Sequence, residues 1–257
     1  MNSDKKVDQL INKYLVISDI HGNLSALEAV LKDCWDETFT GVILLGDHID
    51  YGMRSNEIIQ KLLSLENKEW NRKILINIWG NHEKLIFDKD MERLSSDRGR
   101  IVADYTAKNL SEESLVYLNC NMNKEGLQKF SLNGTLCLAV HGSLYDPYWK
   151  AISPDDLSGD YSSYDIVFSG HSHYSHVFTR FYESDDKNLR NKKAVLFINP
   201  GSVGQPRNQN PCAQYAVLSL PHRCVELRSV EYDIEYEQSL FPPEIDTFYK
   251  DRLERGI

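Results

Sequence analysis

The chain has 257 residues, a length that suits one large domain or two small ones, and we expect a single domain over residues 1–257. Its composition, 41% hydrophobic and 26% charged, excludes collagen-like, low-complexity and wholly disordered classes. The 29 Lys and Arg residues against 38 Asp and Glu give a net charge of −9, which lacks the basic surface that binders of the nucleic-acid backbone need. Anionic substrates stay compatible with this charge, because a bound metal can supply positive charge locally.

The five cysteines are odd in number and none lies in a C-x-x-C pair, which predicts free thiols in a reducing compartment. Residues 1–12 form a short polar extension without the apolar stretch of a secretion signal. No later segment approaches the length needed to span a bilayer. We therefore expect a cytoplasmic protein with no membrane partner and no structural nucleic acid.

The N-terminal half alternates short β-rich apolar runs with helical patterns. Helices are predicted at residues 24–33 and 55–65, and each carries a broad apolar face. The strands predicted around them cover residues 14–18, 41–46 and 73–79. A long mixed region follows and ends near Leu118. Alternation of strand and helix indicates an α/β sheet.

From about Gly126 the chain becomes richer in strands. The runs 127–132 and 135–140 flank an Asn133-Gly134 turn, which predicts a β-hairpin. Later strands are predicted at residues 165–170, 176–182, 194–199, 213–220 and 223–232, with the polar stretch 183–193 as an exposed loop. We expect two sheets packed face to face.

The C-terminal end has the pattern of a short helix over about residues 243–255, starting at the Pro242-Pro243 pair. A proline is favourable at a helix start because its missing N–H needs no partner there. The oligomeric state is open at this stage: the terminal helix or an exposed β-edge could support a homo-oligomer.

Five segments place metal-binding side chains directly after a predicted strand: SDIHGN, GDHIDYG, GNHE, VHGS and GHSH. In open α/β sheets the carboxyl ends of the strands face a common crevice, so residues at these positions converge in space. Glycines flank nearly every segment, which allows sharp turns and close approach to a ligand. The residues concerned are Asp19, His21, Asp47, Asn81, His82, His141, His171 and His173.

Residues two apart on an extended segment point the same way, so we expect Asp19 and His21 to share an ion and His171 and His173 to face one site. Carboxylate, amide and imidazole donors without a thiolate favour manganese, iron or zinc over a structural zinc clamp. Seven ligands exceed what one catalytic ion with an open position takes, whereas two ions about 3.5–4 Å apart use them all, with Asp47 as the natural bridge. Manganese is our first choice, with iron, zinc, nickel or magnesium as alternatives.

Two such cations lower the pKa of a bridging water, so that hydroxide exists near neutral pH, and they clamp the oxygens of an in-line displacement at phosphorus. The leaving alkoxide needs a proton, and a positioned imidazole contributes roughly 10²- to 10⁴-fold to such transfers. His82, next to Asn81, is the candidate donor. These features predict hydrolysis of a phosphoester in a small phosphorylated or nucleotide-like substrate.

The five segments resemble the calcineurin-like metallophosphoesterases, whose pattern runs D-x-H, G-D-x-x-D/G, G-N-H-D/E, a lone G-H or H-G, and G-H-x-H. All five blocks occur in order from Asp19 to His173. The resemblance implies an α/β fold, a four-layer α/β/β/α sandwich of two mixed sheets, with His82 assisting the leaving group. It also implies two ions, one held by Asp19, His21, Asp47 and His173 and the other by Asp47, Asn81, His141 and His171.

The block NPGSVGQPR, residues 199–207, is similar to one found in the compact bacterial and archaeal phosphodiesterase branch of that family. In it Ser202 offers a hydroxyl, and Arg207 could bind a phosphate through paired hydrogen bonds or equally form a surface salt bridge. The family's protein Ser/Thr phosphatases and symmetrical diadenosine tetraphosphate hydrolases carry an arginine where this chain has Tyr51. Tyr51 is a further candidate substrate contact, by stacking on a base, or a packing residue.

The preferred function is a phosphodiesterase, and the alternatives are a phosphomonoesterase or a dinucleoside polyphosphate hydrolase. A protein phosphatase and a non-catalytic scaffold are less favoured, the latter because the full ligand set and His82 are present. Two further polar residues are ambiguous. We interpret His48 as a neighbour of the ligands or a surface residue, and Asp50 as orienting an imidazole or closing a turn.

Overall fold

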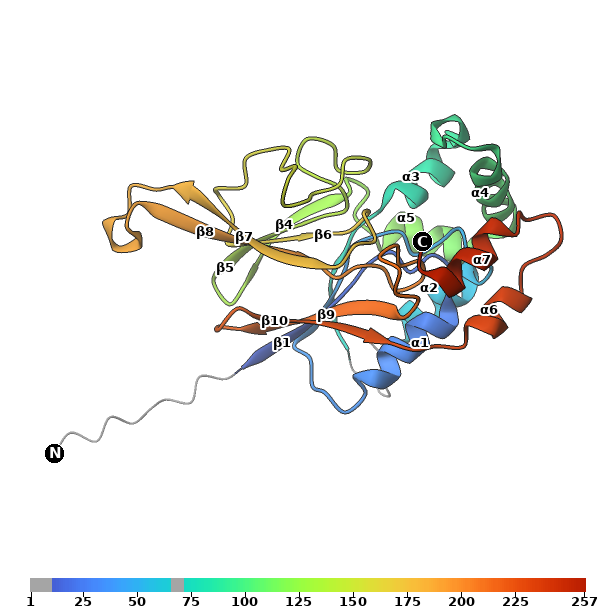
Figure 1. The fold of residues 1–257 in the computed structure, drawn as a ribbon, viewed down its shortest axis with the longest axis horizontal. Coiled ribbons are helices and arrows are strands. Elements are labelled where there is room, and N and C mark those ends of the chain that lie inside the picture. The colour runs from blue at the N-terminus through green and yellow to red at the C-terminus, as the bar shows by residue number, and fades with distance from the viewer. Residues whose placement is uncertain (1–10, 66–71) are drawn as a thin grey trace.

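The computed structural model describes residues 11–65 and 72–257. The expected polar extension over residues 1–12 lies outside this part of the chain, except for its last two residues, of which Asn12 already belongs to a strand. Two five-stranded sheets lie face to face, with helices gathered at one end of the molecule (Figure 1).

The first sheet has the strand order β10-β9-β1-β2-β3, in which β1, β2 and β3 run parallel. Its strands are β1 (Asn12–Ile17), β2 (Gly41–Leu44), β3 (Ile74–Asn77), β9 (Ala213–Leu220) and β10 (Cys224–Val230). The antiparallel strands β9 and β10 extend it beyond β1. The predicted helices α1 (Leu24–Asp33) and α2 (Ser55–Ser64) connect the parallel strands, as an α/β pattern requires.

The second sheet has the strand order β4-β5-β6-β8-β7, in which β5, β6 and β8 run parallel and the edge strands run antiparallel. Its strands are β4 (Leu127–Leu132), β5 (Thr135–Val140), β6 (Ile166–Ser169), β7 (His176–Glu183) and β8 (Lys192–Asn199). The short 3₁₀ helix η2 (Lys187–Leu189) lies in the predicted loop between β7 and β8. Both sheets are therefore mixed, and the predicted α/β fold of two mixed sheets flanked by helices is confirmed.

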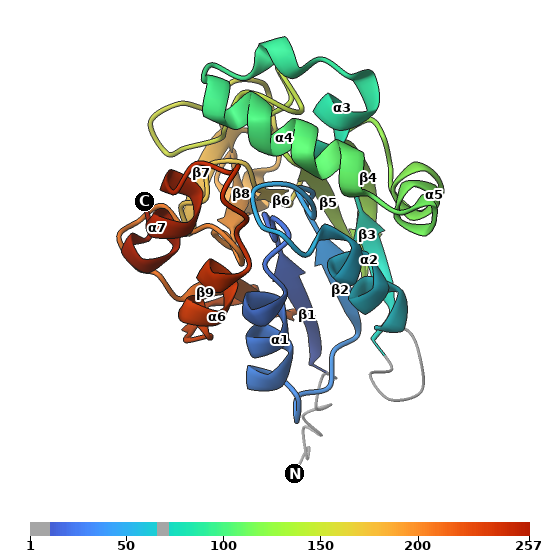
Figure 2. The same ribbon diagram turned by 90° about the vertical axis from the view of Figure 1, so that its right-hand side faces the viewer.

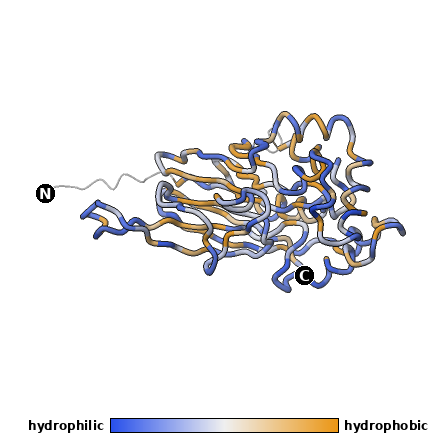
Figure 3. The backbone as a smooth tube through the Cα atoms, turned by 90° about the horizontal axis from the view of Figure 1, so that it is seen from above, coloured by the Kyte–Doolittle hydropathy of each residue, from blue (hydrophilic) through white to orange (hydrophobic). Residues whose placement is uncertain are grey.

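Successive side chains of a strand point to opposite faces of the sheet, and in the first sheet both faces are buried. In β1, Leu15 and Ile17 pack with α1 and α2, whereas Tyr14 and Val16 pack with residues of the second sheet. Figure 3 shows the hydrophobic residues gathered along the strands, with hydrophilic residues on the loops. The two sheets thus share one apolar interface, and the first sheet has a second one with its helices.

The outer face of the second sheet is covered by residues 142–164, which contain turns and bends but no helix. Tyr161 and Ile152 of this segment pack with Val140 and Phe197 of the sheet. The segment is rich in Gly, Pro, Asp and Ser, which favour turns over helix. An irregular layer therefore takes the place of the helical layer over this face.

The mixed region before Leu118 forms a helical cap near the carboxyl ends of the strands (Figure 2). It consists of α3 (Asn81–Asp88), the 3₁₀ helix η1 (Met91–Arg93), α4 (Asp97–Asn109) and α5 (Glu112–Cys120). None of the helices in the described parts of the chain is long and apolar enough to cross a membrane. All five cysteines are free, as the sequence predicts.

The C-terminal segment contains α6 (Ile234–Ser239) and α7 (Phe248–Arg255). The predicted start of the last helix near residue 243 is wrong, because the two prolines enter a turn that Ile245 N–H closes on Pro242 O at 3.1 Å. The helix begins later, where the Asp246 carboxylate accepts a hydrogen bond from Phe248 N at 2.8 Å.

Candidate metal centre

The five predicted segments meet at one end of the two sheets, where strands β1, β2, β3, β5 and β6 finish (Figure 2). The parallel order of these strands brings their carboxyl ends together, although the chain separates Asp19 from His173 by 154 positions. Their side chains form two groups whose candidate ligand atoms lie within 4.8 Å of one another: Asp19, His21, Asp47 and His173, and Asp47, His141 and His171. Asp47 is common to both groups.

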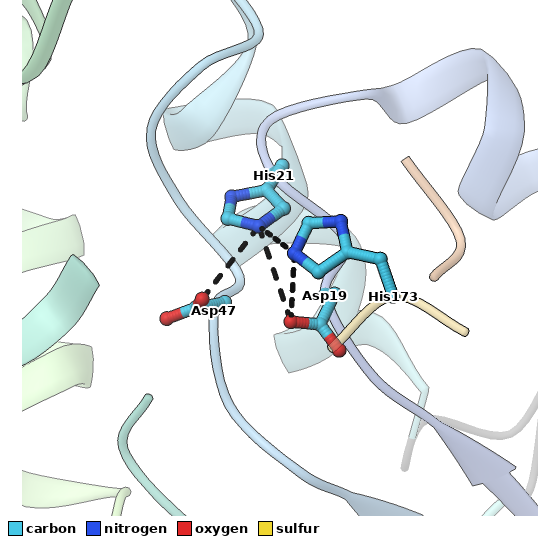
Figure 4. Close-up of side chains that lie close together, drawn as sticks. All are labelled: Asp19, His21, Asp47 and His173. Atoms are coloured by element: carbon cyan, nitrogen blue, oxygen red, sulfur yellow. Dashed lines mark hydrogen bonds and ion pairs between the residues drawn. The ribbon is translucent and has the colours of Figure 1, made fainter. Parts of the chain in front are cut away.

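The first group converges on a point between three loops (Figure 4). His173 Nε2 lies 3.2 Å from Asp19 Oδ1, and His21 Nε2 lies 3.6 Å from Asp47 Oδ2. The two imidazoles also face each other, with 3.2 Å between their Nε2 atoms. All four side chains are buried.

The second group shares the Asp47 carboxylate. Asp47 Oδ2 lies 3.3 Å from His141 Nε2. The amide oxygen of Asn81 joins this group, because Asn81 Oδ1 lies 3.0 Å from His141 Nε2 and 2.8 Å from His171 Nδ1. The structure therefore brings all seven predicted ligands together, in the two sets that the family resemblance implies.

Backbone carbonyls orient three of the imidazoles. His21 Nδ1 lies 3.2 Å from Ile49 O, His141 Nδ1 lies 2.7 Å from Leu45 O, and His173 Nδ1 lies 2.5 Å from Gln205 O. A carbonyl can only accept a hydrogen bond, so in the neutral imidazoles Nδ1 carries the proton and Nε2 presents a lone pair. All three lone pairs then point into the centre.

Each of the two carboxylates accepts a main-chain hydrogen bond at only one of its two oxygens. Asp19 Oδ2 accepts a hydrogen bond from His171 N at 3.2 Å, and Asp47 Oδ1 accepts one from His82 N at 2.9 Å. Asp19 Oδ1 is buried without a hydrogen-bond donor among the described residues. Buried acceptors that face one another without donors are costly. The donor set therefore fits divalent cations.

The ionisation of the site supports this fit. Burial alone would raise the pKa of Asp47, but the imidazoles of His141 and His82 lower it well below its ordinary value. Burial alone would lower the pKa of His141, but Asp47 raises it to about 9. Burial and the neighbouring His141 lower the pKa of His171 to about 4. In the metal-free protein a proton on His141 thus offsets part of the carboxylate charge, and a cation would displace it.

The loops that carry the ligands are not extended. Asp19, His21, Asp47, His171 and His173 all have left-handed backbones, with φ of 54°, 50°, 53°, 63° and 60°. Such values are uncommon outside glycine and occur where the surrounding structure enforces them, often at functional sites. The prediction assumed that the ligands lie on extended segments with alternating side chains, and the left-handed backbones show that this assumption is wrong. His171 and His173 line one cavity, as expected, but they join different ligand groups.

His82 forms a buried pair with Asp50, whose Oδ2 lies 2.6 Å from His82 Nδ1. The other oxygen of Asp50 accepts a hydrogen bond from Thr106 Oγ1 of α4 at 3.0 Å. Burial opposes a charge on His82, but Asp47 and Asp50 raise its pKa. Of the two interpretations of Asp50, the structure supports the orientation of an imidazole.

A family model described as the calcineurin-like phosphoesterase superfamily domain matches residues 13–223. The chain belongs to this superfamily. A solved structure of a metallophosphoesterase from Sphaerobacter thermophilus is 26% identical, with a TM-score of 0.70, over 96% of this chain and 100% of that one. The hypothetical protein PH1004 from Pyrococcus horikoshii shares the fold, with a TM-score of 0.78 and 20% identity over 95% and 98% of the two chains.

Among curated proteins, the uncharacterized protein MJ0912 of Methanocaldococcus jannaschii is 29% identical over 229 residues, which cover 86% of this chain and 88% of that protein. The family assignment makes this calcineurin-like phosphoesterase a phosphoester hydrolase of a class that binds divalent metals.

Glu83 is an organising residue of this phosphoesterase that the sequence analysis missed. Its buried carboxylate accepts hydrogen bonds from Asp47 N at 2.9 Å, His48 N at 2.7 Å and Gly80 N at 2.8 Å. It therefore fixes the loop that carries Asp47. The available signal was its place three residues after Gly80 in GNHE, which is the position of the acidic residue in a helix capping box.

His48 is buried rather than at the surface, and its Nε2 lies 2.8 Å from Asn77 Oδ1. Ser202 is also fully buried: its hydroxyl donates to Asp19 O at 2.7 Å and accepts from Gln205 N at 2.8 Å. The expected substrate contact through Ser202 is therefore not supported, because both roles of its hydroxyl serve to hold the ligand loops.

A cavity of about 120 Å³ opens over the centre, and it is lined by Asp47, Tyr51, Asn81, His82, Leu94, Trp149, His171, His173 and Arg207. The guanidinium of Arg207 has no ion pair or hydrogen bond with any described residue, which argues against the surface salt bridge considered from the sequence. The Tyr51 ring stacks on Tyr249 of α7, with 5.1 Å between centroids and 21° between planes. Its other neighbour is His82, at 4.4 Å.

Proposed function

We propose that this phosphoesterase is a dinuclear metal-dependent phosphodiesterase that hydrolyses a small phosphorylated or nucleotide-like substrate. The observation that carries the proposal is the position of Asp47 Oδ2, which lies 3.6 Å from His21 Nε2 and 3.3 Å from His141 Nε2. One carboxylate oxygen thus lies close to imidazoles of both ligand groups, where Asp47 would contribute to the binding of both ions. When bound, the two ions would activate a water and clamp the oxygens of the reacting phosphoryl group. The donor set, free of thiolate, supports manganese as the first choice.

His82 is placed to supply the proton that the leaving oxygen needs. It lines the cavity, its Nδ1 is held by Asp50, and the neighbouring carboxylates raise its pKa. These carboxylates favour the protonated imidazole, which is the form that general acid catalysis uses. The main-chain N–H of His82 also holds Asp47 Oδ1, so the acid and the shared ligand are fixed relative to each other.

Arg207 is placed to bind the substrate. It lines the same cavity and lacks an ion pair among the described residues, so its guanidinium is available to phosphoryl oxygens. Tyr51 already stacks on Tyr249, which favours a packing role for its ring over stacking on a base. The cavity of about 120 Å³ is below the 300–1,000 Å³ typical of drug-sized ligands. This size supports a substrate whose phosphoryl group enters while its ester groups extend outward.

The preference for a diester rests on the block at residues 199–207 and its likeness to the compact phosphodiesterase branch. A cytoplasmic location stays a prediction from the sequence.

The deciding experiment measures hydrolysis of bis(4-nitrophenyl) phosphate and 4-nitrophenyl phosphate by the chelator-treated protein, with and without Mn²⁺, alongside metal content. We expect Mn²⁺-dependent cleavage that favours the diester, and two ions per chain. Faster cleavage of the monoester would support the phosphomonoesterase alternative. One ion per chain would contradict the dinuclear centre, and bound metal without turnover on either ester would favour a scaffold.

A further inference from the structure

Three arginines lie near one another, one of them in the cavity lining, and none pairs with an Asp or Glu side chain in the described parts of the chain. Arg98 lies in the first turn of α4, Arg207 follows β8, and Arg252 lies on α7. We call them the arginine cluster. The chain has a net charge of −9, so three neighbouring guanidinium groups form a local region of positive charge on an acidic protein.

The ring of Phe248 joins two members of the cluster. Arg98 Cζ lies 3.7 Å from the centroid of this ring, and Arg252 Cζ lies 5.0 Å from it. The residue that follows, Tyr249, stacks on Tyr51 of the cavity wall. Helix α7 therefore brings Arg98 and Arg252 next to the wall of the candidate metal centre.

The third member belongs to that wall. Arg207 lines the cavity, and the loop that follows it is tied to the end of α7, because Gln209 N donates to Gly256 O at 2.8 Å. This contact is close: a Cβ added to Gly256 would lie 2.7 Å from the backbone of Asn210. The arginine cluster thus extends from the metal centre along α7.

Arg252 is the most buried member of the cluster. Arg252 is only 9% exposed, and its Nε donates to the main-chain oxygen of Ile257. Burial and repulsion from Arg207 lower the pKa of Arg252 to about 10. Arg252 has no Asp or Glu side chain as a partner among the described residues, so a bound anion would supply a counter-charge to a largely buried guanidinium.

We propose that the arginine cluster is a subsite for a second phosphoryl group, so that the substrate carries a chain of at least two phosphoryl groups. One phosphoryl group lies at the metal centre, and the next is held by arginine, whose planar fork matches phosphate oxygens. The inference rests on the proposed function in one respect, the position of the first phosphoryl group at the metal centre. An internal phosphoryl group of such a chain has two substituted oxygens, as a phosphodiester has.

Cleavage then breaks a phosphoanhydride bond. The oxygen of water bonds to the phosphorus at the metal centre, and the P–O bond to the neighbouring phosphoryl group breaks. His82 gives its proton to the leaving phosphate oxygen. The attacking water releases its proton to solvent, and His82 takes up a proton from solvent before the next turnover. The arginine cluster stabilises the negative charge of the leaving phosphate.

Binding tests the subsite apart from catalysis. The full chain is treated with chelator, its folding is checked by circular dichroism, and its affinities for inorganic tripolyphosphate and orthophosphate are measured by calorimetry. We expect tighter binding of tripolyphosphate, and a loss of roughly 10-fold in Arg98→Gln and Arg252→Gln, as hydrogen bonds to charged groups are removed. Arg180→Gln is the control, because it removes the same charge from exposed β7 and should change the affinity less than about 2-fold. Arg98 is exposed, so its variant keeps the test valid if the buried Arg252 variant fails to fold.

A second arm replaces tripolyphosphate with adenosine 5′-triphosphate. Equal affinities indicate recognition of the phosphoryl chain alone, and tighter binding of the nucleotide indicates an additional nucleoside contact. Unchanged affinity in both arginine variants, or an equal loss in Arg180→Gln, would overturn the subsite. Failure of the proposed function would appear separately, as absence of metal-dependent cleavage of bis(4-nitrophenyl) phosphate by the unmodified protein.

Discussion

The two sheets contribute different chemistry to one centre. Loops of the first sheet supply both carboxylates and one imidazole, that of His21. Loops of the second sheet supply imidazoles alone, those of His141, His171 and His173. Neither sheet carries a complete ligand group, because each of the two groups contains residues from both. The centre therefore exists only when the sheets are docked, and its geometry depends on that interface.

The docking is visible in contacts that cross between the sheets. His141, after β5, places its Nδ1 2.7 Å from Leu45 O, after β2. At Gly170, after β6, an added Cβ would lie 2.2 Å from Ser18 Oγ, so only glycine allows this approach. A polar centre thus sits at the end of an apolar interface, and the interface sets its distances.

The largest effect is expected from Asp47, the ligand of the first sheet that both groups share. Asp47→Asn should lose both ions and reduce kcat/KM on the order of 10⁴-fold, since several kcal/mol of metal-derived stabilisation are lost. His171→Gln, in the second sheet, serves as the comparison and should lose one ion only. Metal content per chain and diester hydrolysis are the measurements. Retention of two ions in Asp47→Asn would contradict the shared bridge.

Substitution of His82, which lies on a loop of the first sheet, tests proton donation without removing a metal ligand. His82→Ala should keep two ions and lose roughly 10³-fold in kcat, because general acid catalysis is removed. The loss should shrink for substrates with a good leaving group, such as 4-nitrophenol, and grow for alkyl esters. An equal loss for both leaving groups would argue against His82 as the acid.

The pH dependence of the free energy of unfolding tests the interaction between His141, from the second sheet, and Asp47, from the first sheet. In the metal-free protein the pKa of His141 rises from 6.5 unfolded to about 9 folded, so its stabilisation is complete below pH 6.5 and is lost as pH rises through 9. The free energy of unfolding should fall by up to on the order of 3 kcal/mol across that range. His171, with a pKa of about 4, acts in the opposite sense below pH 6.5.

Urea unfolding between pH 6.5 and 9.5 in the presence of chelator measures this slope. His141→Gln should flatten this slope. In the unmodified protein, added Mn²⁺ should displace the proton of His141 and so abolish the slope. A slope that survives unchanged in His141→Gln would assign the effect to another group.

The smallest expected effect concerns Thr106, which braces the first-sheet loop through Asp50. Thr106→Val should reduce kcat roughly 10-fold with KM and metal content unchanged, since residues that orient functional groups typically contribute 10- to 100-fold. Thr106→Ser keeps the hydroxyl and should restore most of the rate. A change in melting temperature alone, without a change in kcat, would limit Thr106 to a structural role.

Much of the fold was predictable because its signals are local. All ten strands lie at or near the predicted runs, and α1 matches its predicted residues, since strand and helix differ in apolar periodicity. The helices of residues 81–120 were missed, because their weaker patterns interrupt one another within a mixed stretch. The start of α7 was misplaced because a proline pair fits both a turn and a helix start.

The sequence by itself determined the family and the set of seven candidate ligands, because each lies in a short motif directly after a strand. Only the tertiary structure decided how they divide into two groups, which carboxylate oxygen is shared, and that Glu83 and Thr106 hold the loops. It also revealed the arginine cluster, whose members lie far apart in sequence. The physical reason is that left-handed loop conformations and contacts between the sheets set the direction of each side chain, and neither leaves a periodic signal in the sequence.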